Sequence, residues 1–135
     1  MNILVIDAQG GGIGKQLVTE IKRNIPSAHI TAVGTNSSAT AAMLKAGADE
    51  AATGENSVIV ACRKANIIVG PIGIVIADSM LGEVTPKMAA AVAQSSAKRI
   101  LIPFSHCDNI IAGISDFSTG NLIRSAINEI QNSAL

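Results

Sequence analysis

The sequence contains almost no aromatic residues. Trp and Tyr are absent, and only two Phe residues occur among 135 positions. Sugar-binding platforms and surfaces that stack single-stranded nucleic acid are built from exposed aromatic rings, so this chain lacks the residues for either. Its core must be built from Ala, Ile, Val and Leu. That mixture suits a buried parallel sheet covered by Ala-rich helices.

Charge is also scarce, and neither sign is in excess. Charged residues make up 15% of the chain, and ten basic side chains balance ten acidic ones. Binding to a nucleic-acid backbone needs a clustered basic surface, so we expect no nucleic-acid partner. The hydrophobic content of 48% excludes a disordered chain.

Cysteines and long hydrophobic runs are few. The two cysteines, Cys62 and Cys107, cannot build a disulfide scaffold, and no His/Cys pairs stand at zinc-ligand spacing, so we expect no metal site. The longest apolar run, residues 67–77, contains Gly and Pro and is shorter than the roughly 20 residues of a membrane helix. The first residues do not resemble a signal peptide. We therefore expect a single cytoplasmic domain over residues 1–135 with no membrane partner.

Apolar patterns predict alternating strands and helices. Helices are expected from Ile13 to the residues before Pro26, from a cap at Ser37 or Ser38 to Ala46, and at residues 57–64, 86–97 and 118–130. Strands are expected at residues 2–6, 29–33, 49–53 (a weak edge strand), 66–69, 100–102 and 109–114, and residues 74–77 as either a strand or a buried loop. This alternation predicts an α/β, Rossmann-like three-layer domain with a mostly parallel sheet.

A glycine-rich loop joins the first strand to the first helix. It comprises Asp7, Ala8 and Gln9, the cluster Gly10, Gly11, Gly12, Ile13 and Gly14, and then Lys15. Such a loop directs backbone N–H groups and the positive end of a helix dipole at an anion. Its position matches the dinucleotide loop of Rossmann domains, although Lys15 replaces the third glycine of G-x-G-x-x-G. We expect a pyrophosphate on the amides of Gly10 to Gly14, with Lys15 as a countercharge.

Two other interpretations of this loop remain open. A variant P-loop, K-G-G-x-G-K-[S/T], matches Gly11, Gly12, Gly14 and Lys15, and residues 74–78 could imitate its Walker B strand. However, Gln16 replaces the hydroxyl residue that binds Mg²⁺. Alternatively, the glycines serve only a tight turn and close packing of helix on strand.

Further candidate residues follow later strands. The carboxyl ends of parallel strands share one sheet edge, so we expect two more groups beside the loop. They are Gly34, Thr35, Asn36 and Ser37 after the second strand, and Gly70, Pro71 and Gly73 after the strand at 66–69. The second strand ends without the acidic residue that would hold an adenosine ribose. Its polar residues could bind a 2′-phosphate instead, which favours NADP slightly over NAD.

Several of these segments resemble a bacterial family of unknown function. They are Val5 to Lys15, Gly34-Thr35-Asn36, residues 45–50 with 53–56, and Gly70-Pro71-Ile72-Gly73 continuing to Leu81-Gly82-Glu83. The resemblance covers essentially the whole chain. It implies a small Rossmann-like domain and supplies no catalytic residues.

The sequence therefore favours a domain that binds a small, phosphate-bearing nucleotide: NADP, NAD or coenzyme A. It would act as a binding or sensing module, or as part of an oligomeric oxidoreductase; whether it is an enzyme stays open. The alternatives are a P-loop enzyme that uses Lys15 on a nucleoside triphosphate and a structural partner-binding protein without a ligand. The high apolar fraction is compatible with a homo-oligomer.

Overall fold

Five parallel strands form one sheet in the computed structural model, which describes residues 1–103, 109–115 and 118–133. The strands are β1 (Asn2–Asp7), β2 (His29–Gly34), β3 (Glu50–Thr53), β4 (Ile67–Pro71) and β5 (Lys98–Ile102). Their order across the sheet is β3-β2-β1-β4-β5, with every neighbouring pair parallel. The chain builds outward from β1 to β3 and then crosses to the other side of β1. The order therefore reverses between β1 and β4.

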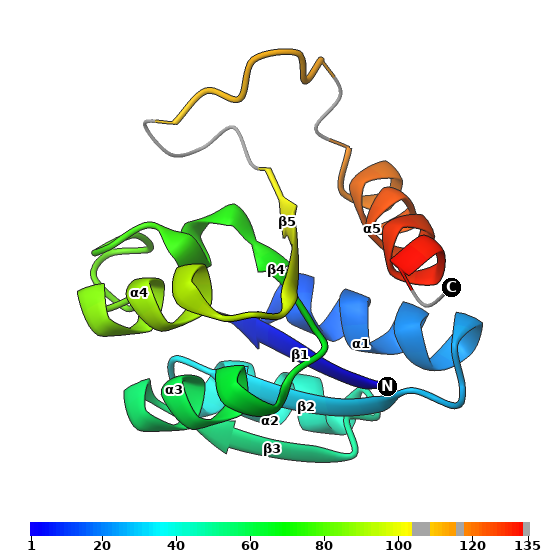
Figure 1. The fold of residues 1–135 in the computed structure, drawn as a ribbon, viewed down its shortest axis with the longest axis horizontal. Coiled ribbons are helices and arrows are strands. Elements are labelled where there is room, and N and C mark those ends of the chain that lie inside the picture. Colours follow the sequence, from blue (N-terminus) through cyan, green and yellow to red (C-terminus); the bar gives the residue numbers. More distant parts are fainter. Residues whose placement is uncertain (104–108, 116–117, 134–135) are drawn as a thin grey trace.

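Helices cover both faces of this sheet (Figure 1). One apolar cluster joins one face to α1, α2 and α5, and a second joins the opposite face to α3 and α4. Their bounds are α1 (Gly12–Asn24), α2 (Ser37–Lys45), α3 (Glu55–Lys64), α4 (Pro86–Gln94) and α5 (Thr119–Ser133). The three-layer, Rossmann-like α/β fold predicted from the sequence is confirmed. Within the described residues, no helix is long and apolar enough to span a membrane.

The strands follow the rule for sheets buried on both faces. All five residues of β4 are buried, as are Ile3 to Asp7 of β1, and both strands are continuous apolar runs apart from the polar Asn2 and Asp7 at the two ends of β1. At the sheet edge, β3 has no fully buried residue. This strand corresponds to the weak edge strand predicted at 49–53. It is weak because it pairs with only one neighbouring strand, β2.

Helix ends agree with the sequence in most places but not in all. Thr85 caps α4, accepting a bond from the Met88 amide, and Pro86 is its first residue, as expected. The cap of α2 is Asn36, whose side chain accepts from the Ala39 amide, so the prediction of Ser37 or Ser38 was wrong. Asn36 has extended backbone angles, whereas the two serines already lie in the helix. Likewise, α4 ends at Gln94, short of residue 97.

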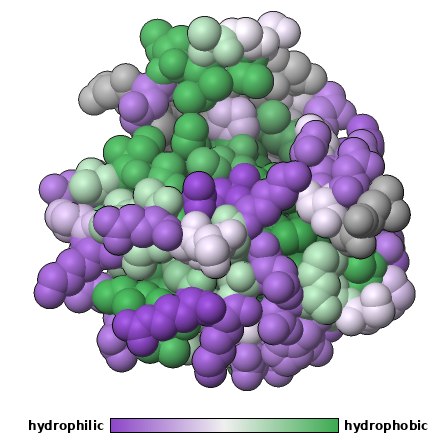
Figure 2. Space-filling view, viewed as in Figure 1, coloured by the Kyte–Doolittle hydropathy of each residue, from purple (hydrophilic) through white to green (hydrophobic). Residues whose placement is uncertain are grey.

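The strand expected at residues 109–114 is absent from the described part of the chain, and residues 74–77, expected as either a strand or a buried loop, form no strand. Ile72–Val75 forms a short 3-10 helix, η1, directly after β4, so residues 74–77 do not extend the sheet. Residues 109–115 contain a turn at Ala112 and Gly113 and no strand, and Ile110 is 95% exposed. Figure 1 shows this segment standing away from the sheet, and Figure 2 shows apolar surface in the same place. An apolar segment forms a strand only where its backbone can pair with the edge of a sheet, and residues 109–115 pair with none of the five strands. Cys107 lies outside the described residues.

Candidate functional site

The glycine loop lines a cavity of about 280 Å³ at the carboxyl ends of β1 and β4. The lining also includes Gln16 of α1, Pro71 at the end of β4, Met80 of the following segment and Thr119, the first residue of α5. Because the strand order reverses between β1 and β4, the cavity lies at the switch point of the sheet. Open parallel sheets bind their ligands at such points.

Asp7 is a buried carboxylate at the floor of this cavity, only 4% exposed. Its Oδ1 accepts a bond from the Ala8 amide at 2.8 Å, and its Oδ2 accepts one from the Gly14 amide at 2.6 Å. The carboxylate therefore caps the N-terminus of α1. Burial raises the pKa of Asp7 more than these amide bonds lower it. Part of the helix terminus that was expected to hold a pyrophosphate already holds this side chain.

Two of the four loop glycines are needed by the fold itself. Gly11 has a φ of +74°, and an added Cβ would lie 2.8 Å from the Ala39 Cα. A Cβ on Gly14 would lie 2.5 Å from the Met43 sulfur and 2.9 Å from the Asp7 Cβ. Both positions therefore bring α1 and its loop close against α2 and β1, where no side chain fits.

The other two loop glycines have no such structural role. A Cβ on Gly10 or Gly12 would meet nothing within 4 Å, and neither residue has a left-handed φ. Both are exposed, and neither backbone N–H has a hydrogen-bond partner in residues 1–103, 109–115 or 118–133. Neither turn geometry nor packing against the described residues explains these glycines. The close approach of a ligand to the backbone would.

Glu83 binds the same loop from the segment between η1 and α4. Its Oε1 accepts three bonds: from the Gln9 amide at 2.8 Å, the Thr35 hydroxyl at 2.7 Å and the Asn36 side-chain amide at 2.8 Å. These bonds, with that from Gln9 the largest contribution, lower the pKa of Glu83. Sequence reasoning missed Glu83, although the Leu81-Gly82-Glu83 stretch belongs to the family resemblance. Only the fold brings it to the end of β2.

The remaining predicted residues divide between packing positions and other surfaces. Gly34 and Gly70 are packed closely against other backbone segments, because an added Cβ would clash with the Thr40 amide or the Ile6 carbonyl, respectively. Gly73 faces the Ser79 and Met80 side chains. Ser37 lies in the first turn of α2 and does not line the cavity.

Lys15 also lies outside the cavity. It lines a separate groove between α1 and α5, together with Arg23 and Arg124. The structure thus gathers residues 7–13 and Pro71 around one space and leaves Lys15 on another surface. Within the described residues, no group of three or more His, Cys, Asp or Glu side chains could hold a metal ion.

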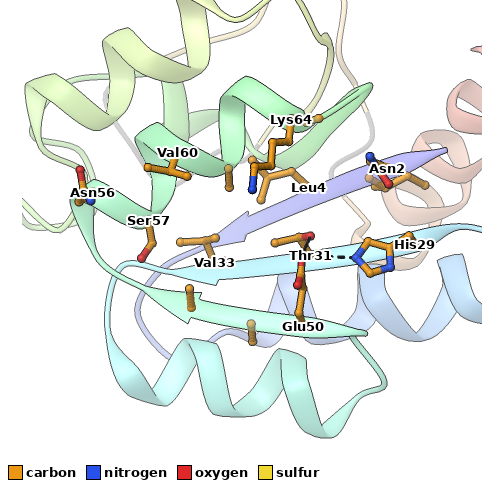
Figure 3. Close-up of a pocket in the computed structure, with 15 residues that line it drawn as sticks. Asn2, Leu4, His29, Thr31, Val33, Glu50, Asn56, Ser57, Val60 and Lys64 are labelled. Carbon is orange, nitrogen blue, oxygen red and sulfur yellow. Dashed lines mark hydrogen bonds and ion pairs between the residues drawn. The ribbon is translucent and has the colours of Figure 1, made fainter.

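A larger groove, of about 460 Å³, lies between α3 and the sheet (Figure 3). Its floor includes Leu4 and Val33, and Thr31, Glu50 and His29 group together at one end. Glu50 accepts from the Thr31 hydroxyl at 2.8 Å and lies 3.3 Å from the His29 Nε2. These polar groups bind one another, and none of the residues predicted from the sequence lines this groove.

The fold and the cavity define a class: a Rossmann-like α/β domain with a glycine loop at the switch point of its sheet. The chain belongs to the family described as Domain of unknown function (DUF3842), whose model matches residues 2–134. Comparison with curated proteins gives no match.

Among solved structures, the chain is similar to a dodecameric FMN-dependent UbiX-like decarboxylase from Escherichia coli O157:H7. The two are 15% identical, with a TM-score of 0.48, and the alignment covers 100% of this chain and 77% of the other. The cofactor, the reaction and the assembly are those of that protein.

Proposed function

We propose that this domain binds a phosphate-bearing nucleotide at the glycine-loop cavity and acts as a binding or sensing module. The observation that carries the proposal is the pair Gly10 and Gly12, which line the cavity, have amides without a partner among the described residues and have open space where a Cβ would lie. A phosphate oxygen accepts N–H bonds at loops of this kind. Glycine permits that approach because no Cβ stands in the way.

The proposal limits where the phosphate binds. Asp7 occupies the Ala8 and Gly14 amides, so the phosphate would bind Gly10 and Gly12 rather than the whole loop. Thr119 also lines the cavity and begins α5, whose N-terminal end carries partial positive charge. Two helix N-termini therefore converge on one small cavity.

The size of the cavity indicates how much of the ligand it holds. Cavities for whole drug-sized ligands measure roughly 300–1,000 Å³. At about 280 Å³, this one suits a phosphate and the groups next to it, and the rest of a nucleotide would extend along the carboxyl edge of the sheet. Gln9, which lines the cavity and contacts Glu83, marks one direction for that extension.

Two observations count against the P-loop alternative. Lys15 lines the α1–α5 groove and not the cavity, so it does not stand where a P-loop lysine meets phosphates. Residues 72–75 form η1, so no strand leads to Asp78 in the manner of a Walker B motif.

The homo-oligomer stays a prediction. The apolar side chains of Leu81 and Ile110 are 96% and 95% exposed, which supports it, and light scattering would measure the oligomeric state.

Glycine-to-alanine variants test the proposal directly. We expect Gly10→Ala and Gly12→Ala to fold normally, because their Cβ atoms meet nothing, and to weaken nucleotide binding at least about tenfold through overlap with the phosphate. Isothermal titration calorimetry with NAD, NADP, coenzyme A and ATP, with and without Mg²⁺, measures this. Gly120→Ala is the matched control, since its Cβ also meets nothing but lies at the α1–α5 groove.

Each result of this titration bears on the proposal. Weaker binding by the loop variants and unchanged binding by Gly120→Ala would support it. A wild-type protein that binds no member of the panel would contradict it, and so would loop variants that bind as tightly as the wild type. Binding that needs ATP with Mg²⁺ would favour the P-loop alternative instead.

A further inference from the structure

We infer that Glu83 determines which nucleotide the cavity accepts: it receives a ribose with free 2′- and 3′-hydroxyls and excludes one that carries a phosphate there. This inference rests on the proposed function and specifies its ligand class.

Glu83 places its carboxylate at the end of β2. Its partners Thr35 and Asn36 directly follow that strand, although they lie 48 and 47 positions away in the sequence. In Rossmann domains, an acidic residue at the end of the second strand binds the ribose hydroxyls of the nucleotide. This chain has Val33, Gly34 and Thr35 there and no acidic residue. The segment between η1 and α4 supplies the missing carboxylate from elsewhere in the chain.

The Glu83 carboxylate is held in place through only one of its two oxygens. All three of its hydrogen bonds go to Oε1, and Oε2 has no partner among the described residues. A carboxylate oxygen is purely an acceptor, so the group that fits Oε2 is a donor such as a hydroxyl. Three fixed bonds orient that oxygen before any ligand arrives, which reduces the entropy lost on binding.

The site is also connected to the proposed phosphate site. The Gln9 amide donates to Glu83, the Gln9 carbonyl accepts from the Asn36 side chain at 2.9 Å, and Gly10 follows directly. Glu83 does not itself line the cavity, but its partner Gln9 does, so a ribose at Glu83 would lie beside the loop residues that would hold a phosphate on Gly10.

A phosphate on the ribose would meet repulsion at the same place. It would carry between one and two negative charges beside the ionised Glu83 carboxylate. The Thr35 and Asn36 side chains, which were expected to bind a 2′-phosphate, already donate to Glu83. NADP and coenzyme A, both phosphorylated on the ribose, are therefore disfavoured against NAD. This reverses the preference drawn from the sequence.

A comparison of NAD with NADP isolates this effect, because the two differ only by one phosphate on a ribose hydroxyl. In Glu83→Gln, the amide oxygen can keep the three bonds of Oε1, while an NH₂ group replaces Oε2 and the charge is lost. Calorimetry on the wild-type protein should give at least about tenfold tighter binding of NAD, and Glu83→Gln should reduce that ratio to near one. Glu129→Gln removes the same charge from α5, about 15 Å along the helix from Thr119, and should leave the ratio unchanged.

The outcomes separate this inference from the proposed function. If the wild-type protein binds both dinucleotides equally or prefers NADP, or if Glu83→Gln keeps the wild-type ratio, the inference is wrong while nucleotide binding stands. If the wild-type protein binds coenzyme A but not NAD, the inference is wrong and the proposed function stands. If it binds neither dinucleotide, nor ADP-ribose, coenzyme A or ATP, both are wrong. Urea unfolding of Glu83→Gln, followed by circular dichroism, verifies that the variant is folded.

Discussion

Asp7 and Glu83 are two carboxylates that accept hydrogen bonds from the same loop, yet their pKa values move in opposite directions. Asp7 is buried, and the loss of water around its charged form raises its pKa above the ordinary value. Glu83 stays close to solvent, and the bonds from Gln9, Thr35 and Asn36 lower its pKa. At neutral pH Glu83 is therefore ionised and able to select among ligands, whereas Asp7 mainly organises the loop.

We expect Asp7→Asn to lower the free energy of unfolding by about 1–3 kcal/mol, the usual cost of a buried donor left without its acceptor. Each carboxylate oxygen accepts one buried amide, and an asparagine has only one such oxygen. Urea unfolding followed by circular dichroism measures the loss. Asp78→Asn is the matched control, because Asp78 is exposed and asparagine tolerates its φ of 64°. Equal stability of the two variants would contradict the capping role.

Helix α1 packs closely against β1 and α2 at its first turn, where glycine leaves room for the neighbouring side chains. Gly14 is buried in its first turn, with the Met43 and Asp7 side chains occupying the space that a Cβ would take. Two residues earlier, Gly12 faces open space. Neighbouring glycines in one helix turn therefore differ: Gly14 is needed for packing, whereas no packing contact requires glycine at position 12.

Alanine at these two positions should have different effects on stability. Gly14→Ala forces Met43 or the helix to move, and we expect it to cost about 1–3 kcal/mol. Gly12→Ala should be neutral or stabilise by up to about 1 kcal/mol, because alanine favours the helix and its Cβ meets nothing. Thermal or urea unfolding of the pair measures both. A destabilised Gly12→Ala would show that this glycine serves the fold and would weaken the proposed function.

Across the whole molecule, ionised carboxylates join elements that are distant in sequence. Asp49 accepts from the Ile30 amide at 2.8 Å and from Lys22 at 2.6 Å, connecting β2 and α1. Glu50 joins β3 to β2 through Thr31, and Glu83 joins its segment to the glycine loop. Hydrogen bonds lower the pKa of all three groups.

These shifts predict acid sensitivity. A carboxylate whose pKa is lower in the folded protein stabilises it above the unfolded pKa, and that contribution disappears as the pH falls through the folded value. The free energy of unfolding should therefore fall as the pH drops below about 4.5, the ordinary value for Glu. The raised pKa of Asp7 opposes this trend, whereas the lowered pKa values of Asp49, Glu50 and Glu83 all contribute to it.

Urea midpoints at pH 7 and pH 3 test this prediction. We expect Asp49→Asn to lose less stability between the two values than the wild-type protein, because it lacks one of the groups that must be protonated. Equal losses would mean that the Asp49 contacts contribute nothing to the pH dependence.

The sequence was sufficient to locate the five strands of the sheet, although not their order, and to identify the glycine loop that lines the candidate cavity. Continuous apolar runs such as Ile67 to Val69 identify buried strands, and Gly and Pro identify their ends, because both signals are local. The loop at residues 7–15 was found for the same reason: a strand, several glycines and a helix are contiguous in the chain. Local signals failed at residues 109–114, where an apolar run has no sheet edge to join.

Only the tertiary structure decided which glycines of the loop are free of packing contacts and which carboxylates bind the loop. The sequence shows four similar glycines, but a Cβ meets Ala39 or Met43 at two of them and nothing at the others. Glu83 reaches Gln9 across 74 positions of sequence, and no pattern predicts such a contact. Strand and helix preferences arise between near neighbours, whereas the ligand class depends on charges that folding brings together from distant segments.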